Sequence, residues 1–448
     1  MGVLAFFAAQ AALALLGFGA AWHPSARALS VLARASVAFG AGAVFLTLEA
    51  TAFSLVGVPW SVGGLALPLL VLSSAAALRW RRVPAPPPPP PVDPGSAPAR
   101  WAIAVGALAL IYLAVALGSS AATSVDYLLF WGVKAVKYAD NKGIDPAFLR
   151  FPYAIHASLD YPPLIPVIHG WGALVAGRLP WRVVPLVSGI PILAAIPVLF
   201  DRCRRRAGES GAAIIAAFWA VAISVSVVHS FSGGGAEPMI LFFETVALAW
   251  LLTERPGESR FVPTLALCGA ALTKVEGLGA AFLVALGVAL LDRGRGRRNS
   301  AARAAGLLAW PLAAVGLWFL YQKTRSLEVG YRPHGELLVV HLDQLGVVVR
   351  ELLRNLEAGS LWIPWGFAAG VILLRIRAWR SVAPALTLAA GLLLFLAFDY
   401  LHDKDDPTQR IGWTAPRVTQ PALSAVILAA GMLSLRKVSA DGPEVLPP

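Results

Sequence analysis

Long apolar segments alternate with short polar segments along the whole chain. Most apolar segments approach the roughly 20 residues that a helix needs to cross the hydrocarbon core of a bilayer, and few charges interrupt them. The pattern predicts an all-α, polytopic integral membrane protein with about 13 transmembrane helices. We expect the spans near residues 3–22, 30–55, 61–78, 101–118, 183–200, 211–228, 238–252, 261–273, 277–291, 303–320, 361–374, 381–399 and 418–435.

The composition supports this class. Of the 448 residues, 58% are hydrophobic and only 14% are charged, whereas a soluble domain carries roughly 25% charged residues. A soluble fold of this composition would lack polar surface. Soluble enzymes, disulfide scaffolds, disordered chains and coiled coils are therefore excluded.

The basic residues predict the orientation. The formal net charge of +12 suggests a nucleic-acid partner, but the Lys and Arg residues lie in short runs at the ends of the apolar segments, as the positive-inside rule requires. We therefore predict no nucleic-acid partner, an extracytoplasmic N-terminus and a cytoplasmic C-terminus. This orientation requires that the segment 164–178 does not cross the membrane, so we expect a juxtamembrane or re-entrant helix there. The basic runs are 79–82, 202–206, 255–260, 293–298, 375–380 and 436–437.

A proline run, 86–91, divides the chain. Consecutive prolines form a stiff polyproline II segment, so we expect a cytoplasmic linker at 79–100. It separates an N-terminal three-span unit, 1–78, from a larger transmembrane region, 101–435. A cytoplasmic tail follows at 436–448.

The first large extracytoplasmic loop contains Asp126, close to the expected membrane boundary. Burial beside apolar neighbours can raise the proton affinity of such a carboxylate, which could then accept a proton from a hydroxyl group. Lys134, eight residues later, would lie on nearly the same helical face. Alternatively, Asp126 is the N-cap of a helix at 127–138. The residues alone leave both interpretations open.

The same loop continues to the sequence Asp160-Tyr161-Pro162-Pro163, which follows His156. The proline pair ends any preceding helix and favours the first turn of the next one. We therefore expect His156, Asp160 and Tyr161 at the mouth of the re-entrant helix.

Five short motifs follow one another on the extracytoplasmic side: Asp126 with W-x-x-K-A at 131–135, D-Y-P-P-L at 160–164, G-G-G-A-E-P at 233–238, T-K-V-E-G-L at 273–278, and His402 followed by R-x-x-Q-P at 417–421. Their order resembles that of the C-type (GT-C) membrane glycosyltransferases, in particular the branch of the protein O-mannosyltransferases and the lipid A aminoarabinose transferase. The resemblance covers about 101–435.

This resemblance implies a glycosyltransferase that moves a sugar from a polyprenyl-phosphate donor to a glycan, lipid or protein acceptor, with Asp126 as the general base. The chemistry also needs cations to hold the departing phosphate, and the cations on the outward side are Lys274, Arg410 and Arg417. The expected substrate-binding residues are Lys134, His156, Asp160, Tyr161, Glu237, Glu276 and His402.

Other interpretations of these residues stay open. Lys274 and Glu276 could pair only with each other in a tight turn, and Glu237 could interact only with the dipole of the helix that it begins. Some GT-C relatives have two acidic residues in the first loop, where this chain has Asp126 alone. We predict no cofactor and no obligatory metal, although His156, Asp160, Glu237 and His402 could assemble a divalent-metal site.

We expect a bacterial plasma (inner) membrane location with the active face outward. Two other functions are considered. A transporter or flippase for lipid-linked sugars would place polar residues on both sides of the midplane, whereas here they concentrate outside. A non-catalytic membrane scaffold would need none of the chemistry above.

Overall fold

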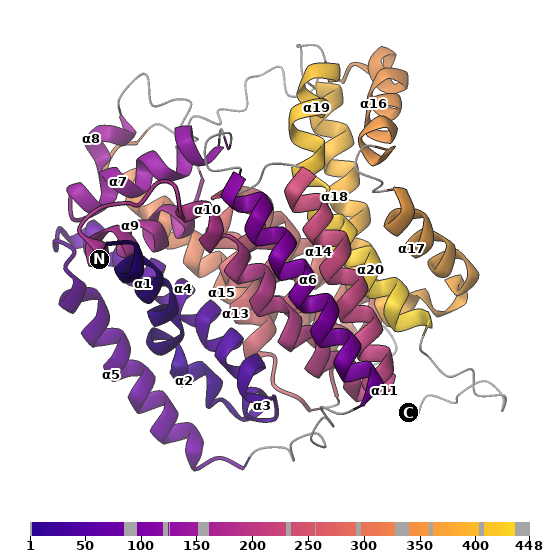
Figure 1. Ribbon diagram of the computed structural model, residues 1–448, viewed down its shortest axis with the longest axis horizontal. Coiled ribbons are helices and arrows are strands. Elements are labelled where there is room, and N and C mark those ends of the chain that lie inside the picture. The colour runs from indigo at the N-terminus through magenta and orange to yellow at the C-terminus, as the bar shows by residue number, and fades with distance from the viewer. Residues whose placement is uncertain are drawn as a thin grey trace.

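The computed structural model of the protein is helical, and no strand occurs among the residues that it describes, which confirms the all-α prediction (Figure 1). These residues are 2–84, 96–119, 124, 126–150, 161–229, 234–255, 257–292, 297–327, 340–357, 362–402 and 407–434. The main helices are α1 (Gly2–Leu16), α4 (Val31–Val56), α5 (Val62–Arg81), α6 (Ala97–Ser119), α7 (Gly132–Asp140), α9 (Leu164–Ala176), α11 (Gly189–His229), α12 (Glu237–Leu252), α13 (Phe261–Thr273), α14 (Val275–Leu291), α15 (Arg297–Thr324), α16 (Leu345–Glu357), α17 (Trp362–Leu374), α18 (Ala383–His402), α19 (Pro407–Val418) and α20 (Gln420–Ser434). Short helices are α2 (Phe18–Ala21), α3 (Pro24–Arg27), α8 (Pro146–Leu149) and α10 (Val184–Val187).

Five helical stretches of the described chain are long and apolar enough to cross a membrane. The other apolar helices are shorter; α9, for example, has 13 residues, about 20 Å of helix against a hydrocarbon core of about 30 Å. The helices support a membrane protein, while the predicted total of about 13 spans stays a prediction. The five stretches are Val31–Val56, Val62–Arg81, Val184–Val228, Asn299–Thr324 and Ile376–Leu401.

Gly208 separates two of the predicted spans inside α11. Its φ of 70° and ψ of −179° are not helical, and an L side chain rarely adopts this conformation. The helix therefore breaks there, between the apolar runs expected at 183–200 and 211–228.

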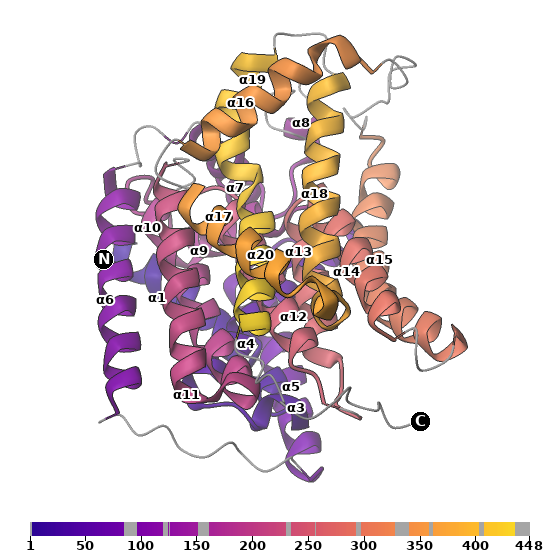
Figure 2. The same ribbon diagram turned by 90° about the vertical axis from the view of Figure 1, so that its right-hand side faces the viewer.

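The two ends of the molecule differ. In Figure 1, α7, α8, α16 and α19 lie at the upper end, whereas α3 and the C-terminal end of α5 lie at the lower end. Figure 2 shows α17, α18 and α20 toward the viewer, with α16 and α19 above them.

Two basic segments meet beside α3, at the lower end of the molecule in Figure 1, where Arg205 donates to the backbone oxygen of Ala28. Arg202 is fully buried, forms ion-pair contacts of 2.5 and 3.0 Å with Glu258, and lies 4.1 Å from the centre of the Trp250 ring. The backbone N–H of Ser30 donates to Asp201, and Arg205 pairs with the same Glu258 at 3.2 Å. Ion pairs thus join segments that are distant in sequence, at the end of the molecule opposite α7 and α19.

The N-terminal helices pack against the rest of the molecule. Helix α1 contacts α9, and α4 contacts α11, α13 and α15. Close contact between α1 and α4 depends on Gly42, where a Cβ atom would lie 1.8 Å from the backbone oxygen of Leu13. The proline run 86–91 lies outside the described residues.

Candidate functional site

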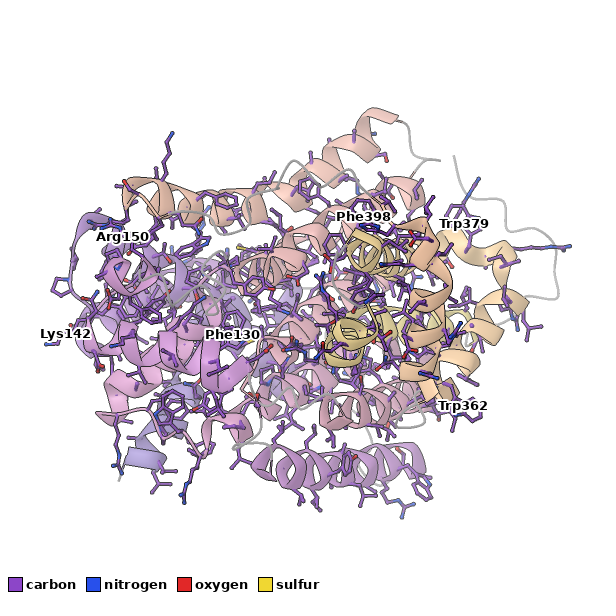
Figure 3. All side chains as sticks on the ribbon, turned by 90° about the horizontal axis from the view of Figure 1, so that it is seen from above. Phe130, Lys142, Arg150, Trp362, Trp379 and Phe398 are labelled. Atoms are coloured by element: carbon purple, nitrogen blue, oxygen red, sulfur yellow. The ribbon has the colours of Figure 1, made fainter. Side chains whose placement is uncertain are left out.

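Asp126 begins a helical segment on the upper end of the molecule. A π-helix, Tyr127–Trp131, follows it directly and continues into α7. Figure 3 views this end from above and shows Phe130, within the π-helix, between the edge marked by Lys142 and Arg150 and the opposite edge marked by Trp362. Because π-helices have more residues per turn than α-helices, the expected α-helical register from Asp126 to Lys134 does not hold.

Asp126 makes no capping hydrogen bond to this helix. Its Oδ2 atom instead accepts a hydrogen bond from Nη1 of Arg417, in an ion pair between residues 291 positions apart. Arg417 lies in the last turn of α19, immediately before α20. The alternative in which Asp126 serves as a helix cap is therefore wrong, and its carboxylate is held by a cation from the far end of the chain.

A second ion pair lies beside the first. Lys274 is the single residue between α13 and α14, and its Nζ atom donates to Oε1 of Glu237 at 3.1 Å. Glu276 also pairs with Lys274, at 3.8 Å. The alternative in which Lys274 pairs only with Glu276 is wrong, because its hydrogen bond goes to the first residue of α12.

The turn at Lys274 depends on Gly277. A Cβ atom at Gly277 would lie 1.9 Å from the backbone oxygen of Ala270, so only glycine allows α13 and α14 to approach this closely. This contact holds Lys274 at the tip of the helical hairpin.

We expect Gly277→Ala to destabilise the protein by about 1–3 kcal/mol, because the added methyl group overpacks a backbone contact. Thermal unfolding of the purified protein in detergent measures the effect. Gly279→Ala is the matched control, since nothing lies within 4 Å of a Cβ atom there. Equal melting temperatures for the two variants would contradict the proposed close contact.

Aromatic rings connect the second ion pair to α7. Nζ of Lys274 lies 5.6 Å from the centre of the Tyr161 ring, which stacks on Trp131 with centroids 5.6 Å apart. Nζ of Lys134 lies 5.4 Å from the centre of the same Trp131 ring. Such cation–π contacts are favourable, the more so when desolvated. Lys134 is almost fully buried, so it supports this stack from inside the protein.

The conformation and packing of Gly234 explain why the G-G-G-A-E-P motif has glycine at this position. Its φ is +79°, and a Cβ atom would lie 2.6 Å from the ring of Tyr127. Its backbone N–H donates to the hydroxyl of Ser188 at 2.6 Å. The turn before Glu237 thus packs against the residue that follows Asp126, and this places the two acidic residues near each other.

The charges of the two ion pairs interact. Burial raises the pKa of the Asp126 carboxyl above its ordinary value, and the negative charge of Glu237 raises it further, while Arg417 and Lys274 oppose the shift. Asp126 lies outside the five possible membrane spans. A carboxyl group with a raised pKa is a better proton acceptor than an ordinary aspartate.

Accessibility differs between the two pairs. The side chains of Arg417 and Asp126 are 19% and 22% exposed, whereas those of Lys274 and Glu237 are 10% and 3% exposed. The Asp126–Arg417 pair is therefore the more accessible of the two to solvent. We call Asp126, Arg417, Lys274, Glu237 and Glu276 the acid–base cluster.

Arg410 belongs to a neighbouring contact. It lies two helical turns before Arg417 on α19 and donates to Asp399 on α18 at 2.7 Å. Its guanidinium carbon lies 6.0 Å from the centre of the Tyr400 ring. Arg410 therefore joins α18 to α19, and the pair that it forms with Asp399 is separate from the two pairs described above.

Three of the predicted residues cannot be placed in this cluster. His156 and Asp160 lie outside the described residues, as does the side chain of His402 at the end of α18. Within the described part of the chain, no group of three or more His, Cys, Asp or Glu side chains could hold a metal ion.

Glu244 is a residue that the sequence analysis missed. It lies two turns after Glu237 on α12 and is 1% exposed. Neither of its carboxyl oxygens has a hydrogen-bond partner among the described residues, and its charge interacts with that of Glu276. The sequence could have indicated Glu244, because it is an acidic residue inside the apolar run 238–252. Ionisable residues inside membrane segments are rare and often functional.

Comparisons with family models, with curated proteins and with solved structures found no match to this chain. The function of the protein must therefore be inferred from the residues and the geometry of the acid–base cluster.

Proposed function

We propose that this protein is a membrane glycosyltransferase of the GT-C type that takes its sugar from a polyprenyl-phosphate donor. The observation that carries the proposal is the ion pair between Asp126 and Arg417, half-buried and close to a second ion pair between Lys274 and Glu237. This arrangement combines a base with cations for an anionic leaving group, which are the groups that the transfer requires.

The cations suit a phosphate group. The guanidinium of Arg417 can donate two parallel hydrogen bonds to phosphate oxygens, and Lys274 contributes a point charge held in place by Glu237 and Glu276. A donor phosphate would compete with Asp126 for Arg417. Donor binding would therefore release the Asp126 carboxylate toward the acceptor.

The transfer is then a single displacement at the anomeric carbon of the sugar. The acceptor hydroxyl gives its proton to the Asp126 carboxylate, and its oxygen forms a bond to the anomeric carbon of the sugar. The bond between that carbon and the phosphate oxygen breaks, and its electron pair leaves with the polyprenyl phosphate. Arg417 and Lys274 stabilise the negative charge that develops on the phosphate. Attack opposite the leaving group inverts the configuration at the anomeric carbon.

The proposed location is the bacterial plasma membrane with the acid–base cluster on the extracytoplasmic side. Support comes from the arginine-rich segment 202–206, which pairs with Glu258 and contacts Ala28, directly after α3, at the lower end of the molecule (Figure 1). Basic loops are typical of the cytoplasmic side.

Purified protein in lipid vesicles with radiolabelled polyprenyl-phosphate sugars, supplied with glycan, lipid and peptide acceptors, tests this proposal. We expect label to move from the donor to one acceptor class. Movement of the donor across the bilayer without transfer would indicate a flippase. Absence of both activities with every donor would indicate a non-catalytic scaffold. Both outcomes would overturn the proposal.

The pH dependence of the transfer depends on Asp126, which must be ionised to act as a base. Because the pKa of Asp126 is raised, acidification should protonate this carboxylate at a higher pH than it would an ordinary aspartate. The rate of transfer should therefore begin to fall at that higher pH. Glu237→Gln removes a charge that raises this pKa, so the acid limb of the pH–rate profile should move to lower pH. Glu351→Gln, on α16, is the control and should leave the profile unchanged. A profile that moves to higher pH in Glu237→Gln would contradict this account.

A further inference from the structure

A separate groove of about 760 Å³ opens beside α7 and α9. Cavities of about 300–1,000 Å³ are typical of ligand sites. No residue of the acid–base cluster lines it. We call it the Trp181 groove, and its lining consists of Val3, Val136, Ala139, Asp140, Ala173, Leu174, Gly177, Arg178, Leu179, Pro180, Trp181, Arg182 and Val183.

Two arginines give this groove a positive charge. Arg178 and Arg182 are both exposed, and neither makes a hydrogen bond or an ion pair with another described residue. Asp140 is the one acidic side chain in the lining. Two guanidinium groups four positions apart, with five N–H donors each, suit a phosphate group.

The remaining lining is mostly apolar, and it leads to an apolar surface. Val3 belongs to the first turn of α1, where the next residue, Leu4, is 77% exposed. Farther along the same helix, Leu15 is 63% exposed. A phosphate held by the arginines would thus have exposed apolar surface beside it for acyl chains. This combination fits a phospholipid rather than a free anion.

Trp181 connects the groove to the acid–base cluster. Its ring lies 5.4 Å from that of Tyr127, the residue after Asp126. A Cβ atom at Gly132 would lie 2.5 Å from the Trp181 ring, so this ring packs directly against the start of α7. One wall of the groove therefore also supports the π-helix that follows Asp126.

We propose that the Trp181 groove binds a resident anionic phospholipid, with its phosphate between Arg178 and Arg182 and its acyl chains along α1. This site differs from the proposed donor site, which uses Arg417 and Lys274. Occupancy would hold Trp181 against Tyr127 and thereby stabilise the segment that carries Asp126.

Native mass spectrometry of the purified protein with phosphatidylglycerol and with phosphatidylcholine tests the charge preference. We expect phosphatidylglycerol to bind more tightly, and the double variant Arg178→Gln, Arg182→Gln to lose about tenfold or more of that affinity. The control is Arg350→Gln, Arg377→Gln, which removes the same charge from exposed positions elsewhere. Equal binding of the two lipids, or equal affinity in the two double variants, would overturn the proposal.

A measurement of tryptophan fluorescence, with both arginines left in place, provides a second test. Brominated phosphatidylglycerol should quench the emission of wild-type protein more than that of Trp181→Phe, because the bromine atoms lie near Trp181 in the proposed complex. Inorganic phosphate at millimolar concentration should not reverse the quenching. Quenching that is the same in both proteins, or that phosphate abolishes, would contradict a lipid in the groove.

Discussion

Replacing Asp126 by asparagine is expected to reduce the rate of sugar transfer by about 10²–10⁴-fold, the usual contribution of a general base. Asparagine preserves the size of the side chain but cannot accept the proton of the acceptor. Donor binding should survive or become tighter, because the variant no longer has a carboxylate that competes with the donor phosphate for Arg417. Transfer and binding of a radiolabelled donor are measured on the same preparation.

The control for this variant is Asp343→Asn, an exposed aspartate before α16. It should transfer sugar at the wild-type rate. If Asp126→Asn retains activity within a few-fold of wild type, Asp126 is not the base. If the variant loses donor binding together with transfer, Asp126 contributes to the binding site rather than to proton transfer.

Arg417→Gln should weaken both donor binding and turnover. Removing one preorganised group that stabilises developing negative charge costs about 10²–10³-fold in rate, and Arg417 also loses its contact with the donor phosphate in the ground state. Binding of unlabelled polyprenyl phosphate, which has no sugar, isolates the phosphate contribution. Arg350→Gln, on the exposed surface of α16, should change neither quantity.

The two variants should therefore differ in how donor binding and sugar transfer change together. Asp126→Asn should separate binding from transfer, while Arg417→Gln should reduce both. An Arg417→Gln variant that binds polyprenyl phosphate as tightly as wild type would contradict the assignment of Arg417 to the leaving group. The ion pair between the two residues would then have a structural role.

The helical character of the chain and the apolar nature of its helices could be predicted from the sequence, since both follow from apolar runs such as 31–56 and 62–81. The number of spans could not be decided in the same way. Helices such as α9, with 13 residues, and α13, also with 13, are shorter than a bilayer crossing requires. Their apolar residues pack inside the protein, which gives the same sequence pattern as a span.

The residues of the acid–base cluster could be identified from loops on one predicted side, but their pairing could not. Asp126 and Arg417 are 291 positions apart, and nothing local indicates that they meet. Local rules left two other arrangements open, a cap at Asp126 and a pair between Lys274 and Glu276 alone. Tertiary packing decided otherwise, because α12, α14 and α19 bring Glu237, Lys274 and Arg417 to one place.

Two details near Asp126 depend on contacts that a sequence pattern does not contain. The π-helix Tyr127–Trp131 changes the register toward Lys134, and Tyr127 packs where only glycine fits at Gly234. The motif around Gly234 indicated a turn, whereas the reason for glycine is the ring of an aromatic residue more than a hundred positions earlier. Side-chain packing therefore explains what the spacing of the motifs could only suggest.

A structure of the protein with polyprenyl phosphate bound would show directly whether Arg417 and Lys274 hold the leaving group. We expect density for the phosphate between the guanidinium of Arg417 and the ammonium of Lys274, with the Asp126 carboxylate released from Arg417 and open to an acceptor. A phosphate bound elsewhere, with the contact between Asp126 and Arg417 unchanged, would contradict this expectation.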